Sequence, residues 1–259
     1  MLIRSSIVSG VLGLLALAPA FAADSVLVVD RGLPQVNLNN SSGPVRSNVR
    51  WALEEPGFLG DSLTIGSYGE RWVIDSIRTW TVPGQHHEQP AELGDFYQDV
   101  RLYFGRSDGD ATPVAAGQMA RGSNETGNPN IRITDATQSG AQLYDNFGTS
   151  LRIWQVDFTN LNLAVDGGVA YNFGAWGLGR SIPDAPGKTY LWFNHASNAG
   201  LSGAAQDGAD GAMVIFDGGG RTQGVFRSEG SGWDKNSDVN VQIFAHRMAG
   251  HTTQAASLQ

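Results

Sequence analysis

Short apolar runs with a period of two residues recur along this chain, and they constrain its fold more than any other feature. Residues 72–82 alternate apolar and polar side chains until Pro83 and Gly84 end the run. Residues 99–104 and 151–158 combine branched and aromatic side chains with charged ones. Alternation of this kind, bounded by Gly, Pro, Asn or Asp, is typical of half-buried strands rather than of helices. The sequence therefore predicts an all-β protein.

About ten strands are expected. The others are residues 25–29, 62–65, 169–176, 189–194, 212–216 and 239–245. The best helical candidate, residues 113–121, is short and contains Gly117, so it predicts at most one turn within a loop. Many strands without intervening helices favour antiparallel sheets. We therefore expect residues 23–259 to form one domain, a two-sheet antiparallel β-sandwich of jelly-roll type with long loops.

The first 22 residues have the features of an export signal. Arg4 supplies a positive charge, residues 7–17 are apolar, and Ala20-Phe21-Ala22 has the small-x-small form of a cleavage site. We therefore expect a secreted or periplasmic protein. The chain contains no cysteine, so its stability must come from burial of apolar surface rather than from disulfides. No later run approaches the roughly 20 apolar residues of a membrane-spanning helix, so no membrane span is expected.

The charge balance argues against one class of partner. The chain has 17 basic and 25 acidic side chains, a formal net charge of −8, and its only lysines are Lys188 and Lys235. Nucleic acids bind to clustered Lys and Arg side chains. We therefore expect no nucleic-acid partner, and the sequence leaves the oligomeric state open.

Residues 60–64, Gly-Asp-Ser-Leu-Thr, resemble the block that names the GDSL, or SGNH, esterase family. The resemblance implies that Ser62 is a nucleophile, and that chemistry needs a neighbouring base. The family takes its base from an Asp-x-x-His near the C-terminus, whereas neither His246 nor His251 has an Asp at that spacing. The family also needs a parallel sheet with helices. We therefore interpret residues 61–65 as a strand after a turn and predict no catalytic residue.

Residues 60–65, 72–80 and 238–244 together resemble strands of secreted bacterial β-sandwich modules, the jelly-roll group that includes many carbohydrate-binding modules. The resemblance extends over most of the mature chain as a pattern, and it implies this architecture and the binding of a sugar or a surface. Sugar rings stack on aromatic side chains, and polar side chains bond the hydroxyls. The candidate ligand-binding residues are Trp51, Trp176, Trp192, Asn194 and Trp233.

Two local contexts suggest these candidates. Trp51, Trp176 and Trp233 lie in or beside glycine-rich turns, from which a side chain could project toward a ligand. Trp192 and Asn194 share one segment and could line a groove, although such an aromatic side chain more often fills a core.

Calcium is the cofactor that the sequence favours, since residues 85–88, which could bind zinc, are better interpreted as a solvated loop. Asp207 and Asp210 lie in a Gly-rich acidic turn and could supply carboxylate oxygens to a structural calcium ion. The turn does not have the pattern of an EF-hand, so a pair of solvated acidic residues is the alternative interpretation. We expect no organic cofactor.

Three functional hypotheses follow. The first is a non-enzymatic exported module that binds a carbohydrate or another cell-surface or matrix component. The second is a structural or matrix assembly protein that associates through exposed sheet edges. The third is a secreted polysaccharide hydrolase or lyase, or an esterase, built on the same sandwich. A coupled acid and base, or Ser62 beside a histidine, would favour the enzyme, and an open groove with solvent-facing aromatic residues would favour binding.

Overall fold

The structure is a computed structural model, and the residues it describes are 24–32, 49–83, 92–136, 144–146, 149–197, 210–227 and 237–248. The predicted export signal, residues 85–88, Asp207 and Trp233 lie outside these ranges.

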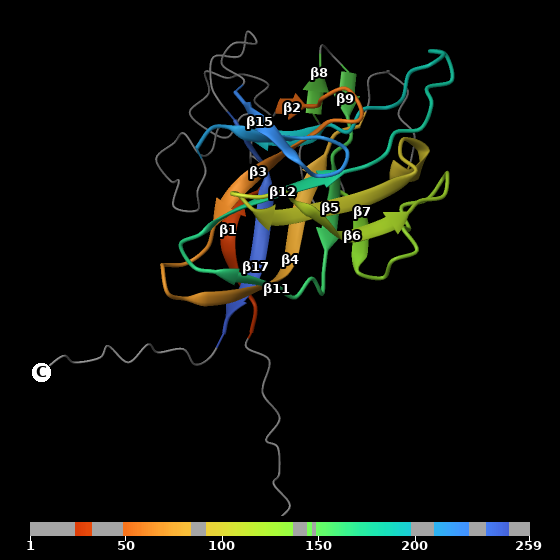
Figure 1. Cartoon of the computed structure of the whole chain (residues 1–259). Coiled ribbons are helices and arrows are strands. Elements are labelled where there is room, and N and C mark those ends of the chain that lie inside the picture. The colour runs from red at the N-terminus through yellow and green to blue at the C-terminus, as the bar shows by residue number, and fades with distance from the viewer. Residues whose placement is uncertain are drawn as a thin grey trace, which may run out of the picture.

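The described chain forms two large antiparallel sheets and a small hairpin, which Figure 1 shows with the two large sheets stacked as layers. The nine-stranded sheet contains β1 (Val26–Arg31), β2 (Val49–Trp51), β4 (Arg71–Thr81), β7 (Ile131–Asp135), β10 (Trp154–Phe158), β11 (Leu163–Asp166), β13 (Asn194–Ser197), β16 (Asp238–Val239) and β17 (Val241–Arg247). The six-stranded sheet contains β3 (Phe58–Thr64), β5 (Asp99–Arg106), β6 (Thr112–Gln118), β12 (Ala170–Trp176), β14 (Met213–Phe216) and β15 (Thr222–Phe226). The hairpin pairs β8 (Tyr144–Asn146) with β9 (Thr149–Leu151).

This architecture confirms the predicted two-sheet β-sandwich, although the described residues contain 17 strands rather than about ten. The chain passes repeatedly between the layers, since β3, β4 and β5 follow one another in sequence but belong alternately to the six-stranded and nine-stranded sheets. Within the described ranges, Leu93–Asp95 form a short 3-10 turn, η1. No helix within the described ranges is long and apolar enough to cross a membrane.

Alternation along each strand sets which side chains form the core. In β17 the side chains of Val241, Ile243 and Ala245 are buried between the layers, whereas Gln242 and Phe244 are half-buried on the opposite face. This is the period of two that a strand imposes on a sheet with one face packed and one face toward solvent. The nine-stranded sheet therefore presents a continuous outer face made of every second side chain.

The strands at the centre of that sheet run in a fixed order, β1-β17-β4-β10-β7. β17 and β10 flank β4 on its two sides, and β1 and β7 form the two edges of this path. Because antiparallel partners directly opposite each other point to the same face, the pairing register shows which outer side chains are neighbours.

Candidate functional site: the outer face of the nine-stranded sheet

The expectation that Trp176 projects from a turn is wrong. Trp176 is the last residue of β12 and only 5% of it is exposed. Its ring stacks on Phe58 at a centroid distance of 5.6 Å, and the guanidinium of Arg101 lies 5.4 Å from its centroid. The glycine beside it admits another ring, since a Cβ at Gly177 would lie 2.6 Å from Trp192. The glycines around Trp176 therefore allow close packing and do not mark an exposed loop.

Trp192 and Asn194 are also buried, so they fill the core and do not line a groove. The indole Nε1 of Trp192 donates to Asn194 Oδ1 at 3.2 Å, and Asn194 Nδ2 donates to the carbonyl of Leu59 at 2.6 Å. The two side chains thus satisfy each other's polar groups inside the sandwich. Trp51 belongs to the short strand β2, and only its strand position is described. With Trp233 outside the described residues, a ligand role for these two tryptophans stays a prediction.

The predicted calcium ligand Asp210 has a local structural role. Its Oδ1 accepts a hydrogen bond from the Ala212 amide at 2.9 Å, and its own amide donates to Asp238 Oδ1 at 3.0 Å. Within the described part of the chain, no group of three or more His, Cys, Asp and Glu side chains is arranged to hold a metal ion. Because Asp207 is not described, the calcium site stays a prediction.

Ser62 lies on β3, which confirms the strand predicted for this segment. Its amide donates to Asp61 Oδ1 at 2.7 Å, and no hydrogen bond joins its hydroxyl to a histidine among the described residues. The glycine of the same block, Gly60, has a packing role, because a Cβ there would lie 2.1 Å from the carbonyl oxygen of Phe173. Gly60 therefore allows β3 and β12 to pack closely at this position.

One row of polar side chains crosses the five strands of the path β1-β17-β4-β10-β7 at a single register. Asp30 on β1 pairs with Gln242 on β17, which pairs with Arg78 on β4. Arg78 pairs with Asp157 on β10, and Asp157 pairs with Arg132 on β7. We call these five residues the polar row. Each strand therefore contributes one side chain that can donate or accept hydrogen bonds.

Hydrogen bonds hold the centre of the polar row in place. Arg78 Nε donates to Asp157 Oδ1 at 2.5 Å, and Arg78 Nη1 donates to Gln242 Oε1 at 3.3 Å. Gln242 Nε2 in turn donates to Asp30 Oδ1 at 3.0 Å, and Gln155 Nε2 donates to Asp157 Oδ2 at 2.8 Å. Side chains fixed in this way lose little further entropy when they meet a ligand.

The centre of the row keeps hydrogen-bonding capacity. Arg78 Nη2 has no hydrogen-bond partner among the described residues, and each oxygen of Asp157 accepts only one bond there. The Arg78 side chain is 33% exposed and that of Asp157 is 14% exposed. A guanidinium offers donors and a carboxylate offers acceptors side by side, which matches two adjacent hydroxyl groups.

An apolar pair lies beside the polar row. Leu27 on β1 is 43% exposed and pairs in register with the half-buried Phe244 on β17. The guanidinium carbon of Arg78 lies 5.8 Å from the Phe244 ring centroid, so this ring adjoins the centre of the row. We call the polar row, Gln155, Leu27 and Phe244 together the outer-face site.

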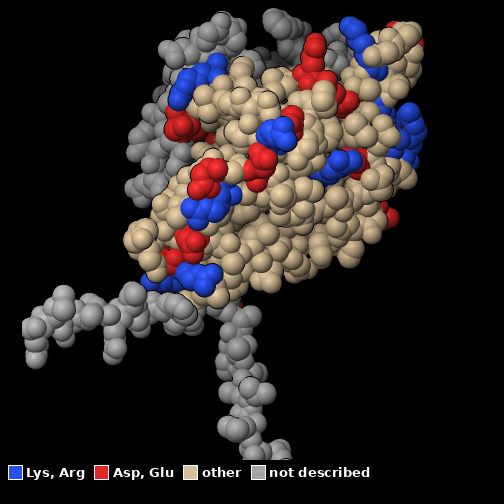
Figure 2. Space-filling model, viewed as in Figure 1, with Lys and Arg blue, Asp and Glu red and all other residues tan. Residues whose placement is uncertain are grey.

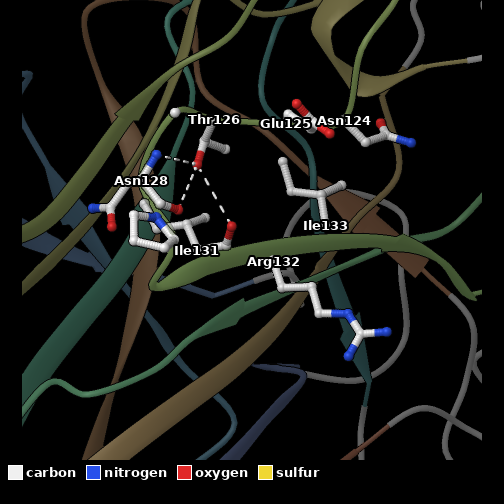
Figure 3. Close-up of a pocket in the computed structure, with 9 residues that line it drawn as sticks. Asn124, Glu125, Thr126, Asn128, Ile131, Arg132 and Ile133 are labelled. Carbon is white, nitrogen blue, oxygen red and sulfur yellow. Dashed lines mark hydrogen bonds between the residues drawn. The ribbon is translucent and has the colours of Figure 1, made fainter.

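A hollow of about 470 Å³ lies beside β7, and Figure 3 shows residues 124–126 and Ile133 on one side of this strand and the Arg132 side chain on the other. The hollow is lined by Arg132 and its two strand neighbours and by residues 124–129. Thr126 Oγ1 stabilises that loop, since it accepts from the Asn128 amide at 3.3 Å and donates to the Asn128 carbonyl at 3.2 Å. Figure 3 shows Arg132 and Ile133 leaving the strand in opposite directions, as expected for successive strand residues.

A buried ionic cluster lies inside the sandwich. Arg31 Nη1 on β1 is 3.1 Å from Asp61 Oδ2 on β3 and 3.9 Å from Asp238 Oδ1 on β16. Burial raises the pKa of Asp61 to about 8 against the opposing effect of Arg31, and burial also raises the pKa of Asp238. The Asp61 and Asp238 side chains are at most 1% exposed, so this cluster does not reach a ligand and has a structural role.

The two described histidines are paired away from Ser62. His195 is buried, and its Nδ1 lies 2.5 Å from Asn240 Oδ1, while burial lowers the pKa of this imidazole to about 4. His246 Nδ1 lies 2.8 Å from Asp75 Oδ2 near the end of β17. Both of these histidine contacts are therefore to residues other than Ser62.

Charged side chains of both signs are mixed on the face of the molecule that Figure 2 presents. Exposed pairs such as Arg106–Asp108 at 3.2 Å and Arg247–Glu70 at 3.1 Å have this character. On that face there is therefore no cluster of basic side chains of the kind that binds a phosphate backbone.

Comparison of the chain with protein-family models, with curated proteins and with solved structures finds no match. Function must therefore be argued from the outer-face site itself.

Sequence reasoning did not find this site. Its central residues Arg78, Asp157 and Gln242 all lie in segments that the sequence identifies as strands, at positions where a polar residue interrupts apolar ones. The period of two therefore marks them as outward-facing. Their alignment in one row depends on how distant strands pair, with Arg78 and Gln242 separated by 164 positions, and no local pattern contains that register.

Proposed function

We propose that the protein is an exported binding module that holds a carbohydrate on the outer-face site. The observation that supports this proposal is the Arg78–Asp157 pair, fixed at 2.5 Å and half-buried beside the Phe244 ring. Sugars combine hydroxyl groups around the ring with flat patches of C–H groups. The pair supplies donors and acceptors for the hydroxyls, and Phe244 with Leu27 supplies an apolar surface for the ring face.

The test is a glycan array probed with the purified protein and with two arginine variants. Arg78→Ala removes the central donor of the site, whereas Arg106→Ala removes an arginine at the end of β5 that pairs with Asp108 at 3.2 Å and with Asp166 at 3.9 Å. We expect the Arg78→Ala variant to bind the best glycan at least about tenfold more weakly, since hydrogen bonds to charged groups are among the stronger ones. The Arg106→Ala variant should bind like the wild type.

The proposal fails if no glycan binds, or if the Arg78→Ala variant binds as tightly as the wild type. Thermal denaturation of each variant checks that the fold is intact. Phe244→Ala is a second test of the same site, because it removes the aromatic surface and leaves the Arg78–Asp157 pair in place. We expect this variant also to bind glycan more weakly. Repeating the array with and without calcium tests the separate proposal that Asp207 and Asp210 hold this ion.

Exposed apolar residues at sheet edges favour a second function, assembly of a matrix. Val26 and Leu27 on β1 are 52% and 43% exposed, and Val225 on β15 is 62% exposed. β1 and β15 are edge strands of the two sheets, and such edges can pair with another chain. Light scattering across protein concentration tests this alternative, because assembly predicts a mass that rises with concentration and that is lower for Val225→Lys.

A further inference from the structure

The direction of the polar row carries information about the shape of the ligand. The row runs perpendicular to the strands, from Asp30 on β1 to Arg132 on β7, with one residue on each of five strands. Neighbouring strands are about 4.8 Å apart, so the four intervals span about 19 Å. That strand spacing is close to the length of one pyranose ring in a linear chain. Each successive sugar of such a chain would therefore meet the side chain of the next strand.

The charges of the row carry information about the chemistry of the ligand. Two carboxylates, Asp30 and Asp157, and two guanidinium groups, Arg78 and Arg132, give the row a formal charge of zero. The whole chain has a formal charge of −8. A polyanionic glycan would meet no net positive charge in the row and a negative protein around it. A neutral glycan needs no counter-charge, and its hydroxyls both donate to carboxylates and accept from guanidinium groups.

The apolar residues Leu27 and Phe244 lie at only one end of the polar row, so the two ends differ in chemistry. Leu27 and Phe244 lie beside the β1 and β17 end of the row, whereas the opposite end, on β7, is the exposed side chain of Arg132. A linear chain would therefore stack one ring on Phe244 and place its other end at Arg132. A single sugar occupies only one of these positions.

From these observations we infer that the ligand is a neutral, linear glycan that lies across the strands and contacts the row with about four sugar residues. This inference rests on the proposed carbohydrate-binding function of the same site. It adds the charge, the shape and the orientation of the ligand, which the function alone leaves open.

The test is calorimetry with oligosaccharides of two to six residues. The neutral probes are β-1,4-linked oligomers of glucose, mannose and xylose, and the acidic probes are oligogalacturonates. For the neutral series that binds, we expect affinity to rise with each residue up to about four, the number set by the span of the row, and then to level off. Affinity for a neutral chain should also be insensitive to salt, because no net charge is neutralised on binding.

Two end variants test the orientation. Asp30→Ala and Arg132→Ala each remove one end of the row, and both side chains are exposed, so the fold should tolerate the change. We expect each variant to weaken binding of the tetrasaccharide several-fold, up to about tenfold, and to leave binding of the disaccharide unchanged. Arg106→Ala on the other sheet is the matched control and should change neither affinity.

The outcomes separate this inference from the proposed function. If sugars bind and Arg78→Ala abolishes binding, but affinity is the same for two and six residues, the glycan does not lie along the row and the inference is wrong. The inference is also wrong if oligogalacturonates bind more tightly than every neutral series, or if both end variants bind the tetrasaccharide like the wild type. If no sugar binds, or if Arg78→Ala has no effect, the proposed function itself fails.

Discussion

Trp176 shows how a buried aromatic residue can look like a ligand-binding one in the sequence. Its ring packs against Phe58 on one strand and the guanidinium of Arg101 on another, with only 5% of the residue exposed. Replacing a buried Trp by Ala leaves a cavity and typically costs about 3–5 kcal/mol. We therefore expect Trp176→Ala to lower the free energy of unfolding by that amount, measured by urea denaturation.

Phe244→Ala is the matched control for this prediction. Phe244 is half-buried on the outer face, so its removal should cost less stability while it weakens glycan binding. We therefore expect Trp176→Ala to reduce mainly the free energy of unfolding and Phe244→Ala to reduce mainly the affinity for glycan. A Trp176→Ala variant that keeps wild-type stability but loses glycan binding would show that this ring faces a ligand after all.

At the scale of the strand, β1 is an edge that a buried charge holds in place. Arg31 near its end bonds the Ser62 carbonyl at 2.9 Å and pairs with Asp61 at 3.1 Å. Asn240 Nδ2 also donates to the Arg31 carbonyl at 2.7 Å. Removing Arg31 leaves the buried Ser62 carbonyl without this donor and takes away the group that faces Asp61 and Asp238, and a buried polar group without its partner typically costs about 1–3 kcal/mol. We expect Arg31→Met to lower the free energy of unfolding by about that much.

Hydrogen exchange measured by mass spectrometry locates the effect of this change. In the Arg31→Met variant, amides of β1 and of its partner β17 should exchange faster, because the edge strand has lost its main anchor. Arg78→Met removes an arginine from the same sheet at a half-exposed position and should leave both exchange and stability nearly unchanged. Equal exchange in the wild type and Arg31→Met would mean that β1 is held by its backbone pairing alone.

Strands with clear alternation could be predicted from the sequence, and strands without it could not. Residues 72–82 and 169–176 correspond closely to β4 and β12. The sequence predicts at most one helical turn within a loop for residues 113–121, because this segment is short and contains Gly117, whereas residues 112–118 form β6. It forms the edge of the six-stranded sheet, where a strand needs only one partner and tolerates proline.

Residues 189–194 illustrate the opposite error. Their aromatic and branched side chains predict a strand, but only an isolated bridge between Ser181 and Thr189 forms there, and β13 begins at Asn194. The apolar side chains of this segment fill the core from irregular backbone instead. Tyr97, for example, packs on Trp192 at a centroid distance of 4.8 Å and bonds the Leu191 carbonyl at 2.8 Å. Burial, which the sequence indicated correctly, is therefore compatible with more than one backbone shape.

At the scale of the whole molecule, the buried titratable groups couple proton binding to folding. Burial holds the pKa of Asp61 at about 8 in the folded chain, compared with an ordinary value of 3.8, and it raises the pKa of Asp238 in the same direction. Between pH 3.8 and about pH 8, Asp61 keeps its proton in the folded chain and loses it in the unfolded chain. The contribution of Asp61 to stability therefore falls as pH rises through this range. His195, with its pKa lowered to about 4 from 6.5, acts in the opposite sense, because the unfolded chain takes up a proton as pH falls below 6.5.

The two effects oppose each other below pH 6.5, and only the carboxyl effect remains between pH 6.5 and 8. We therefore expect the free energy of unfolding to fall by about 2 kcal/mol across that upper interval, at 1.36 kcal/mol per pH unit. Thermal and urea denaturation from pH 5 to 9 measures it. Asp61→Asn should remove most of this slope, although its stability at pH 6.5 should also be lower, because the amide nitrogen cannot accept the bond that Asp61 Oδ2 receives from the Val239 amide at 2.6 Å. A stability that rises between pH 6.5 and 8, or a slope that survives in Asp61→Asn, would mean that Asp61 is ionised inside the fold and that Arg31 compensates its charge.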